Sequence, residues 1–205
     1  MVCDSSGNPS IHWNEFLTAY GPILILWTTA FVLLALPAFS LLSALFQAVF
    51  LLLWSYGVHL LTHNMPTHFP FNILNPHISV HHNHDIEMTR WLSLIIEAAE
   101  NFKPFFLLEI IQRLLGIRLI STSAILTAAM LYINIHIFDY SIYGDPTHSL
   151  HHEKTFCNYG PEPFDTLFGT RCDPERPYTN LSNQWIHTVI ACSIALNCKL
   201  LFALN

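Results

Sequence analysis

Histidine is the residue type that stands out in this sequence, because it accounts for 13 of the 205 residues. Most of the histidines fall into four groups along the chain, namely His59 and His63, then His77, His81, His82 and His84, then His136, and finally His148, His151 and His152. A single histidine near a helix end is more often a surface or hydrogen-bonded residue than a metal ligand. Several imidazoles in an apolar chain are costly, however, unless they are paired or ligated. The grouping therefore predicts a metal site.

Two of these groups have a spacing that suits metal binding from a helix. His59 and His63 are four residues apart, so both side chains would lie on one face and could hold a metal from one side. In the last group, His148 is three residues from His151 and four from His152. The adjacent pair diverges by about 100° on a helix, so the triplet can serve two metals at once.

The second group has an irregular pattern. On a helix, His77, His81 and His84 would share one face, and His82 would point about 100° away from His81. The group can still supply ligands to two metals. The spacing leaves open whether His77, His84 or the nearby His68 completes it.

The number of histidines favours a two-metal centre. The sequence has no HExxH motif and no carboxylate-rich cluster beside the histidines, and a structural zinc ion needs only four ligands. Eight or more imidazoles exceed the needs of one metal. Imidazole suits iron, zinc, copper and nickel alike, so the ligand type does not choose among them.

The composition indicates a membrane protein. Hydrophobic residues make up 52% of the chain and charged residues 11%, where a soluble domain carries roughly 25% charged residues. Seven glycines exclude a collagen-like chain, and a net charge of −6 argues against a nucleic-acid partner. No charged residue occurs in 16–84, and the apolar part of that segment has room for two helical crossings of about 20 residues, with a tight turn at 37–40.

The later apolar runs complete the predicted topology. The runs 119–138 and 177–198 are uncharged and long enough to cross, whereas 91–117 carries five charged residues and suits an interfacial or half-inserted hairpin broken at Lys103-Pro104. For His136 to lie at the same membrane face as His63, the chain between them must cross an even number of times. The segment 91–117 must therefore enter the membrane and pair with the next run.

We thus expect an all-α integral membrane protein with about four transmembrane helices in two hairpins and a His-rich di-metal site under a short cap. Residues 1–205 are expected to form one membrane domain that ends in a hydrophobic helix at 183–204. If this last helix crosses, the C-terminus lies opposite the active face. If it packs along the membrane, His187 could approach the metal site.

The charge distribution predicts that the His-rich face is cytoplasmic. All Lys and Arg residues lie between Arg90 and Lys199, mainly in two stretches beside the histidine groups, and positive loops favour the cytoplasm. The five cysteines are odd in number and lack CxxC spacing. We therefore expect free thiols rather than disulfides or a thiolate zinc site.

Several motifs resemble those of the fatty acid hydroxylase / sterol desaturase superfamily, which comprises integral-membrane, non-haem di-iron enzymes. The HLLTH motif at 59–63, followed by Asn-Met-Pro, is similar to the first histidine box of this family, and His136 is similar to the third. The HSLHH motif at 148–152 matches the last box. The FCNYG segment at 156–160 and the FDTLFGT segment at 164–170 match the signature that follows it.

The resemblance covers about residues 45–172 and departs from the family at the second box. The family reads HxxHH there, whereas Ile78 stands where the first histidine is expected and His77 lies one residue early. This departure implies a rearranged site or a relative without activity.

The resemblance implies an enzyme that uses two irons and O2 to hydroxylate or desaturate a C–H bond of a sterol, fatty acyl or sphingoid lipid in the endoplasmic reticulum membrane. The implied iron ligands are His59, His63, His77, His81, His82, His136, His148, His151 and His152. It also implies a cytochrome b5-type electron donor and its reductase, because the chain has no Gly-rich dinucleotide motif.

Other roles and functions stay open at this point. Asp139 and Asp145 could orient ligating imidazoles or could cap turns, and Asp165 is expected to cap or anchor the closing loop. A haem carrier would pair histidines such as His59 and His136 on facing helices but would not explain the HxxHH motif. A zinc-dependent membrane lipid hydrolase would use fewer histidines and more acidic ligands, and a non-catalytic lipid-binding relative is the third alternative.

Overall fold

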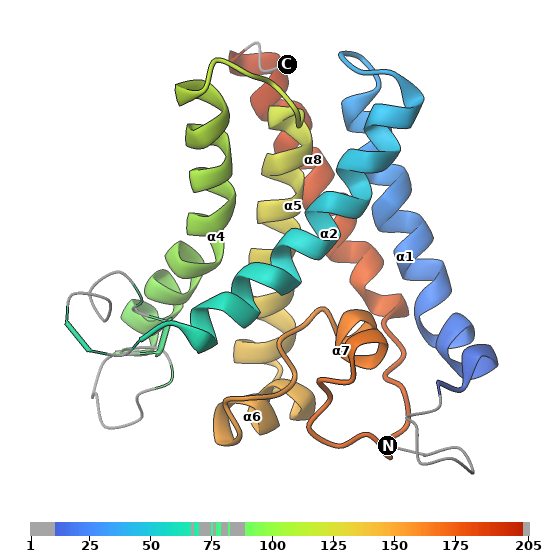
Figure 1. Ribbon diagram of the computed structural model, residues 1–205, viewed down its shortest axis with the longest axis vertical. Coiled ribbons are helices and arrows are strands. Elements are labelled where there is room, and N and C mark those ends of the chain that lie inside the picture. The colour runs from blue at the N-terminus through green and yellow to red at the C-terminus, as the bar shows by residue number, and fades with distance from the viewer. Residues whose placement is uncertain are drawn as a thin grey trace.

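The computed structural model shows a bundle of helices (Figure 1). It describes residues 11–66, 68, 69, 75, 77, 78, 82 and 89–202, and no strand occurs within these residues. The predicted all-α class is confirmed for this part of the chain. The predicted ligand His81 and the alternative ligand His84 lie outside the described residues.

Five long helices form the bundle in the described part of the chain. They are α1 (Trp13–Ala35), α2 (Leu41–Asn64), α4 (Arg90–Leu114), α5 (Thr122–Asn134) and α8 (Trp185–Phe202). Helix α5 continues directly into the π-helix η2 (Ile135–Ile142). The short helices are α6 (Pro146–Glu153) and α7 (Glu162–Phe168), and the 3-10 turn η3 (Ser182–Gln184) precedes α8.

The long helices alternate in direction (Figure 1). Helix α1 runs away from the end that holds α6 and α7, α2 returns to it, α4 runs away again, and α5 with η2 returns. We call this end, at the bottom of Figure 1, the site end. Two antiparallel helical segments, α4 and then α5 with η2, therefore lie between His63 and His136 and bring both residues to the site end. Helix α8 then runs to the opposite end, where the C-terminus lies.

Three helical segments are long and apolar enough to cross a membrane, namely Trp13–Ala35, Leu41–Asn64 and Thr122–Ile142. Helix α8 has a shorter apolar stretch, and α4 carries charged side chains along its length. Three helices, rather than the predicted four, thus meet these criteria. Their outward faces expose large apolar residues such as Leu33 and Leu42, which is the surface expected to meet lipid.

Helix α4 is one unbroken helix, so the predicted break at Lys103-Pro104 is wrong. A proline within a helix removes one backbone hydrogen bond, but it does not end a helix whose buried face continues on both sides of it. The buried residues of α4 are Glu97, Asn101, Phe105, Leu108 and Gln112. This face packs against α5, and the packing outweighs the lost hydrogen bond.

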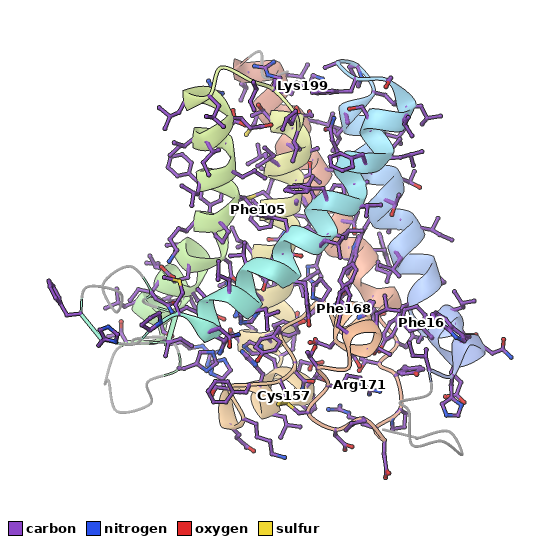
Figure 2. All side chains as sticks on the ribbon, viewed as in Figure 1. Phe16, Phe105, Cys157, Phe168, Arg171 and Lys199 are labelled. Carbon is purple, nitrogen blue, oxygen red and sulfur yellow. A yellow bond between two sulfur atoms is a disulfide. The ribbon has the colours of Figure 1, made fainter. Side chains whose placement is uncertain are left out.

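Positively charged residues lie at both ends of the bundle. Figure 2 shows Arg171 at the site end and Lys199 at the opposite end. Arg113, in the last turn of α4, is also at the opposite end. The charge asymmetry between the two ends is therefore smaller than the linear sequence suggests.

Gln112 fastens the turn that joins α4 to α5. Its buried side-chain oxygen accepts hydrogen bonds from the backbone N–H groups of Leu119 (2.9 Å) and Ile120 (2.7 Å). Its amide nitrogen donates to the Ile120 carbonyl at 3.2 Å. These bonds satisfy backbone groups at the start of α5, which an apolar side chain at position 112 would leave without partners.

We expect Gln112→Leu to lower the free energy of unfolding by about 2–3 kcal/mol, because buried backbone groups would lose their partners. Denaturant unfolding in detergent, followed by tryptophan fluorescence, measures the effect. Arg113→Leu is the matched control, because the Arg113 side chain is 63% exposed and its ion pair with Glu109 is worth about 1 kcal/mol or less. An equal loss of unfolding free energy in the two variants would contradict this role of Gln112.

Candidate metal centre

Five histidines from three parts of the chain converge at the site end. His59 and His63 come from the last turns of α2, His77 and His82 from the segment after it, and His151 from α6. We call these residues the five-histidine group. One nitrogen of each ring lies within 4.8 Å of one nitrogen of every other ring. All are buried except His82, which is partly exposed.

The separations between the Nε2 atoms match those of ligands on one metal ion. The Nε2 atom of His63 is 3.1 Å from those of His59 and His77, and the latter two are 3.0 Å apart. Three mutual contacts cannot all be hydrogen bonds, because a neutral imidazole carries a single N–H. Nitrogens at about 2.1 Å from a metal and at right angles to each other are about 3.0 Å apart. The group therefore has the geometry of a metal site.

Backbone carbonyls orient two of these rings. The Nδ1 atom of His59 lies 2.5 Å from the Tyr159 carbonyl, and that of His151 lies 2.6 Å from the Cys157 carbonyl. A carbonyl only accepts, so each Nδ1 carries the proton and each Nε2 presents its lone pair to the centre of the group. The buried Nε2 of His151 has no hydrogen-bond partner among the described residues, as expected of an atom that ligates a metal.

The environment also favours the ligating, neutral form of His151. Burial lowers the pKa of His151 to about 4, because the charged imidazolium is poorly solvated there. A neutral imidazole is the form that binds metals. His151 is therefore ready to act as a ligand at neutral pH.

A π-type turn, rather than an α-helix, pairs His77 with His82. The N–H of His82 donates to the carbonyl of His77, five residues back, at 3.1 Å, and the two Nε2 atoms are 3.3 Å apart. The wider turn places residues i and i+5 side by side, so His82 lies beside His77, which an α-helix would place on a different face. The predicted angle between His82 and His81 involves a residue outside the described part of the chain. Of the three residues left open, His77 joins the five-histidine group, His68 is exposed and outside the group, and His84 lies outside the described residues.

A second buried group lies beside the first and consists of Glu97, His136 and His148. The Nε2 atom of His136 is 3.0 Å from Oε1 of Glu97, and the three potential ligand atoms lie within 4.8 Å of one another. We call these residues the Glu97 group. His136 belongs to the π-helix η2, and the Tyr140 ring on the same element stacks on His148 at 4.4 Å.

Helix α6 contributes to both groups. His151 belongs to the five-histidine group and His148 to the Glu97 group. The Nε2 atoms of His148 and His152 are 2.8 Å apart, and the His152 ring stacks on His82 with centroids 4.4 Å apart. The HxxHH triplet therefore spans two adjacent potential metal positions, which is the arrangement that its spacing predicts.

Glu97 is the site residue that sequence reasoning missed. We expected it to be one of several charges on an interfacial helix, but its side chain is 3% exposed. Helical spacing places it in line with Asn101 and Phe105 on the buried face of α4. An ionisable residue on the inward face of an apolar helix is a recognisable functional signal.

Asp165 anchors the loop that covers the site, in line with its predicted role. One carboxylate oxygen accepts hydrogen bonds from the Tyr159 N–H (2.8 Å) and the Thr170 hydroxyl (2.7 Å), and the other accepts from the Gly160 N–H (2.7 Å). Asn158 and Gly160 adopt φ values of 55° and 62°, which Asn and Gly tolerate best. The Asn-Tyr-Gly segment thus forms a tight loop that presents the Tyr159 carbonyl to His59.

Cys157 and Cys172 form a disulfide, so the prediction of free thiols is wrong for this pair. The loop returns on itself: the Asn158 N–H donates to the Thr170 carbonyl (2.7 Å), and Cys172 N–H donates to the Asn158 side chain (2.8 Å). This return brings the two Cα atoms to 5.0 Å although the cysteines are 15 positions apart in sequence. Cys192 is free, as predicted.

The carboxylates of the two other aspartates bond to groups other than the candidate ligand atoms. Asp139 lies 2.9 Å from Nε2 of His187, at the start of α8, and His187 belongs to neither group. Asp145 caps α6 by accepting hydrogen bonds from the Thr147 N–H (2.7 Å) and the His148 N–H (3.2 Å). Of the two roles left open for Asp145, the structure supports capping.

The described residues thus contain a buried His-rich site able to hold a metal ion, at one end of a bundle with helices that could span a membrane. Comparisons of this chain with family models, curated proteins and solved structures found no match.

Proposed function

We propose that this protein is a membrane-embedded, O2-dependent lipid hydroxylase or desaturase of the fatty acid hydroxylase / sterol desaturase type, with two irons as its cofactor. The observation that carries the proposal is the pair of adjacent buried ligand groups joined by α6. A single metal would not need both. The sequence motifs at 148–152 and 164–170 favour iron over the other metals that imidazole binds.

The residues present fit two metal ions. In the five-histidine group, the Nε2 separations and the lone pair of His151 are those of preformed ligands. In the adjacent position, His136 and His148 offer further imidazoles, and His152 lies between the positions. Two irons held there would supply the activation of O2 for attack on an unactivated C–H bond.

The protein's own contribution is to orient the ligands and exclude water. Carbonyls of the Asn-Tyr-Gly loop fix the tautomers of His59 and His151. The partly buried rings of Tyr132 and Tyr140 border the site on the bundle side, where Tyr132 O–H lies 3.2 Å from Nδ1 of His59. A dry, rigid site of this kind limits loss of the oxidant to water.

A lipid is the substrate class that suits this position. A small cavity of about 50 Å³ lies between α2 and α4 and is lined by His59, His77 and Phe105, among others. The cavity therefore lies between candidate metal ligands and helices whose outer faces are apolar. We propose that the hydrocarbon part of a sterol or of an acyl or sphingoid lipid approaches the site from this side.

The proposed electron donor sets the orientation. We place the site end at the cytoplasmic face of the endoplasmic reticulum membrane, where a cytochrome b5-type protein and its reductase would supply electrons. This orientation predicts that the Cys157–Cys172 pair, which is a disulfide in the structure, is reduced in the cell, because cytosolic thiols rarely stay oxidised.

We expect the Asn180-Leu-Ser sequon, which lies near the site end, to carry no glycan in this orientation. Expression in a eukaryotic host followed by glycosidase digestion and gel shift tests this. Placing a sequon in the turn between α1 and α2, at the opposite end, provides the positive control. A glycan on Asn180 would contradict the cytoplasmic orientation.

The proposed activity is tested by a lipid-product screen. Iron-loaded protein in detergent is incubated with a reduced cytochrome b5-type donor, its reductase, isotopically labelled O2 and membrane lipid extract, and the products are analysed by mass spectrometry. The proposal predicts lipids that gain one labelled oxygen atom or lose two hydrogens, only when O2 and donor are both present. Hydrolysed lipids instead, or binding without turnover, would favour the zinc hydrolase or the non-catalytic relative.

A further inference from the structure

We infer that Glu97 is a metal ligand, and that the two metal positions differ because one is held by imidazoles alone and the other by a carboxylate with imidazoles. The inference rests on the two-metal centre of the proposed function but not on its catalytic activity.

The position of Glu97 is unusual for a glutamate. It is 3% exposed, and it lies on the inward face of α4, whereas the two histidines of its group lie on η2 and α6. A buried carboxylate needs positive charge or several hydrogen-bond donors to offset its desolvation. The Ser141 hydroxyl donates to Oε1 of Glu97, and no Lys or Arg pairs with Glu97 among the described residues.

The contact with His136 has the geometry of two ligands on one metal. Oε1 of Glu97 and Nε2 of His136 are 3.0 Å apart, close to the separations among the Nε2 atoms of the five-histidine group. His148 presents its ligand atom within 4.8 Å of both. Glu97, His136 and His148 thus surround a common point from α4, η2 and α6.

Charge balance gives an independent reason for a carboxylate at this position. Two divalent ions held by neutral imidazoles alone would place a large positive charge in a site shielded from water, which is costly. Glu97 is the one acidic side chain that joins either ligand group in the described part of the chain. Its oxygen is also a harder ligand than imidazole, so the two positions should differ in metal affinity.

The test is a Co²⁺ titration of the metal-free, detergent-solubilised protein, followed by visible absorbance and by elemental analysis after desalting. We expect the wild-type protein to bind about two equivalents in two spectroscopic phases. Glu97→Gln, which keeps size but removes the charge, should retain the first phase and weaken the second at least about 10-fold. Glu97→His, which offers a nitrogen ligand, should bind both equivalents of Co²⁺, and the absorbance spectrum of the second phase should differ from that of the wild type.

Glu100→Gln is the matched control, because Glu100 lies on the same helix but pairs with Lys103 at 2.5 Å and joins neither group. It should behave as the wild type. Two unchanged phases in Glu97→Gln would overturn the inference and leave the proposed function standing. No Co²⁺ binding by the wild type would instead overturn the two-metal centre itself. Gel filtration of each variant verifies folding. If Glu97→Gln does not fold, Glu97→His provides the test: a Co²⁺ absorbance spectrum of the second phase identical to that of the wild type would overturn the inference.

Discussion

Replacing His63 by alanine is expected to abolish lipid oxidation and to remove the metal from the five-histidine group. The Nε2 atom of His63 lies 3.1 Å from those of His59 and His77, so its loss opens the centre of the group. Activity in the lipid-product screen should fall by at least about 100-fold, because losing a ligand costs more than the 10–100-fold typical of an outer-shell partner. Elemental analysis of the same preparation should show a fall from about two metal ions per chain to about one, because the Glu97 group is intact.

His68→Ala controls for a general effect of removing a histidine near the site. His68 lies in the same part of the chain but is exposed and outside both groups. We expect its metal content and product yield to equal those of the wild type. Full metal content in the His63→Ala protein, or equal losses in the two variants, would contradict the assignment of the five-histidine group.

Asp165 is expected to make the stability of the protein depend on pH. Burial raises the pKa of Asp165 to about 7, although three hydrogen-bond donors oppose this shift. Because the folded pKa exceeds the ordinary value of 3.8, the folded state holds the proton more tightly than the unfolded state. The resulting stabilisation is complete below about pH 4 and is lost as the pH rises to about 7.

The measurement is thermal unfolding in detergent between pH 4 and pH 8 for the wild type and for Asp165→Asn, which cannot ionise. The histidines titrate in both proteins, so the difference between the two curves isolates Asp165. We expect this difference to change between about pH 4 and pH 7 and to be flat above that range. Parallel curves over the whole range would contradict a raised pKa. Asp165→Ala should be destabilised at every pH by about 2–4 kcal/mol, since buried donors lose their acceptor.

The hydrophobic helices were predictable because their signal is local. The uncharged segment 16–84 is long enough to predict the two helices α1 and α2, and counting passes between His63 and His136 predicted that two antiparallel helices lie between them. The continuity of α4 through Pro104 was not predictable in this way. The continuity depends on packing against α5, and this tertiary contact cannot be predicted from the residues of 91–117 alone.

The candidate site was predictable where helical spacing decides it and not where the chain leaves the α-helix. Alpha-helical geometry explains why His59 and His63 lie on one face of α2. It also explains why the histidines of α6 contribute to two different groups. The pairing of His77 with His82 follows from a π-type turn, which cannot be predicted from the spacing of the histidines in the sequence.

Glu97 and the cysteine pair depend on tertiary structure. Glu97 meets His136 because α4 and η2 pack together, and its identity as a site residue appears only when the buried face of α4 is known. Cys157 meets Cys172 because Asn158 and Asp165 fold the closing loop back on itself. The cysteine pair leaves no pattern in the linear order of residues, and the helical spacing of Glu97 with Asn101 and Phe105 becomes a signal only once their shared face is known to be buried.

The metal content of the purified wild-type chain is the measurement that tests the two-metal centre most directly. The protein is expressed in iron-supplemented medium, solubilised in detergent and analysed for iron, zinc and haem per chain. The two ligand groups predict about two irons per chain and no haem absorption band. One zinc ion, bound haem, or no metal in a folded protein would contradict the proposed centre.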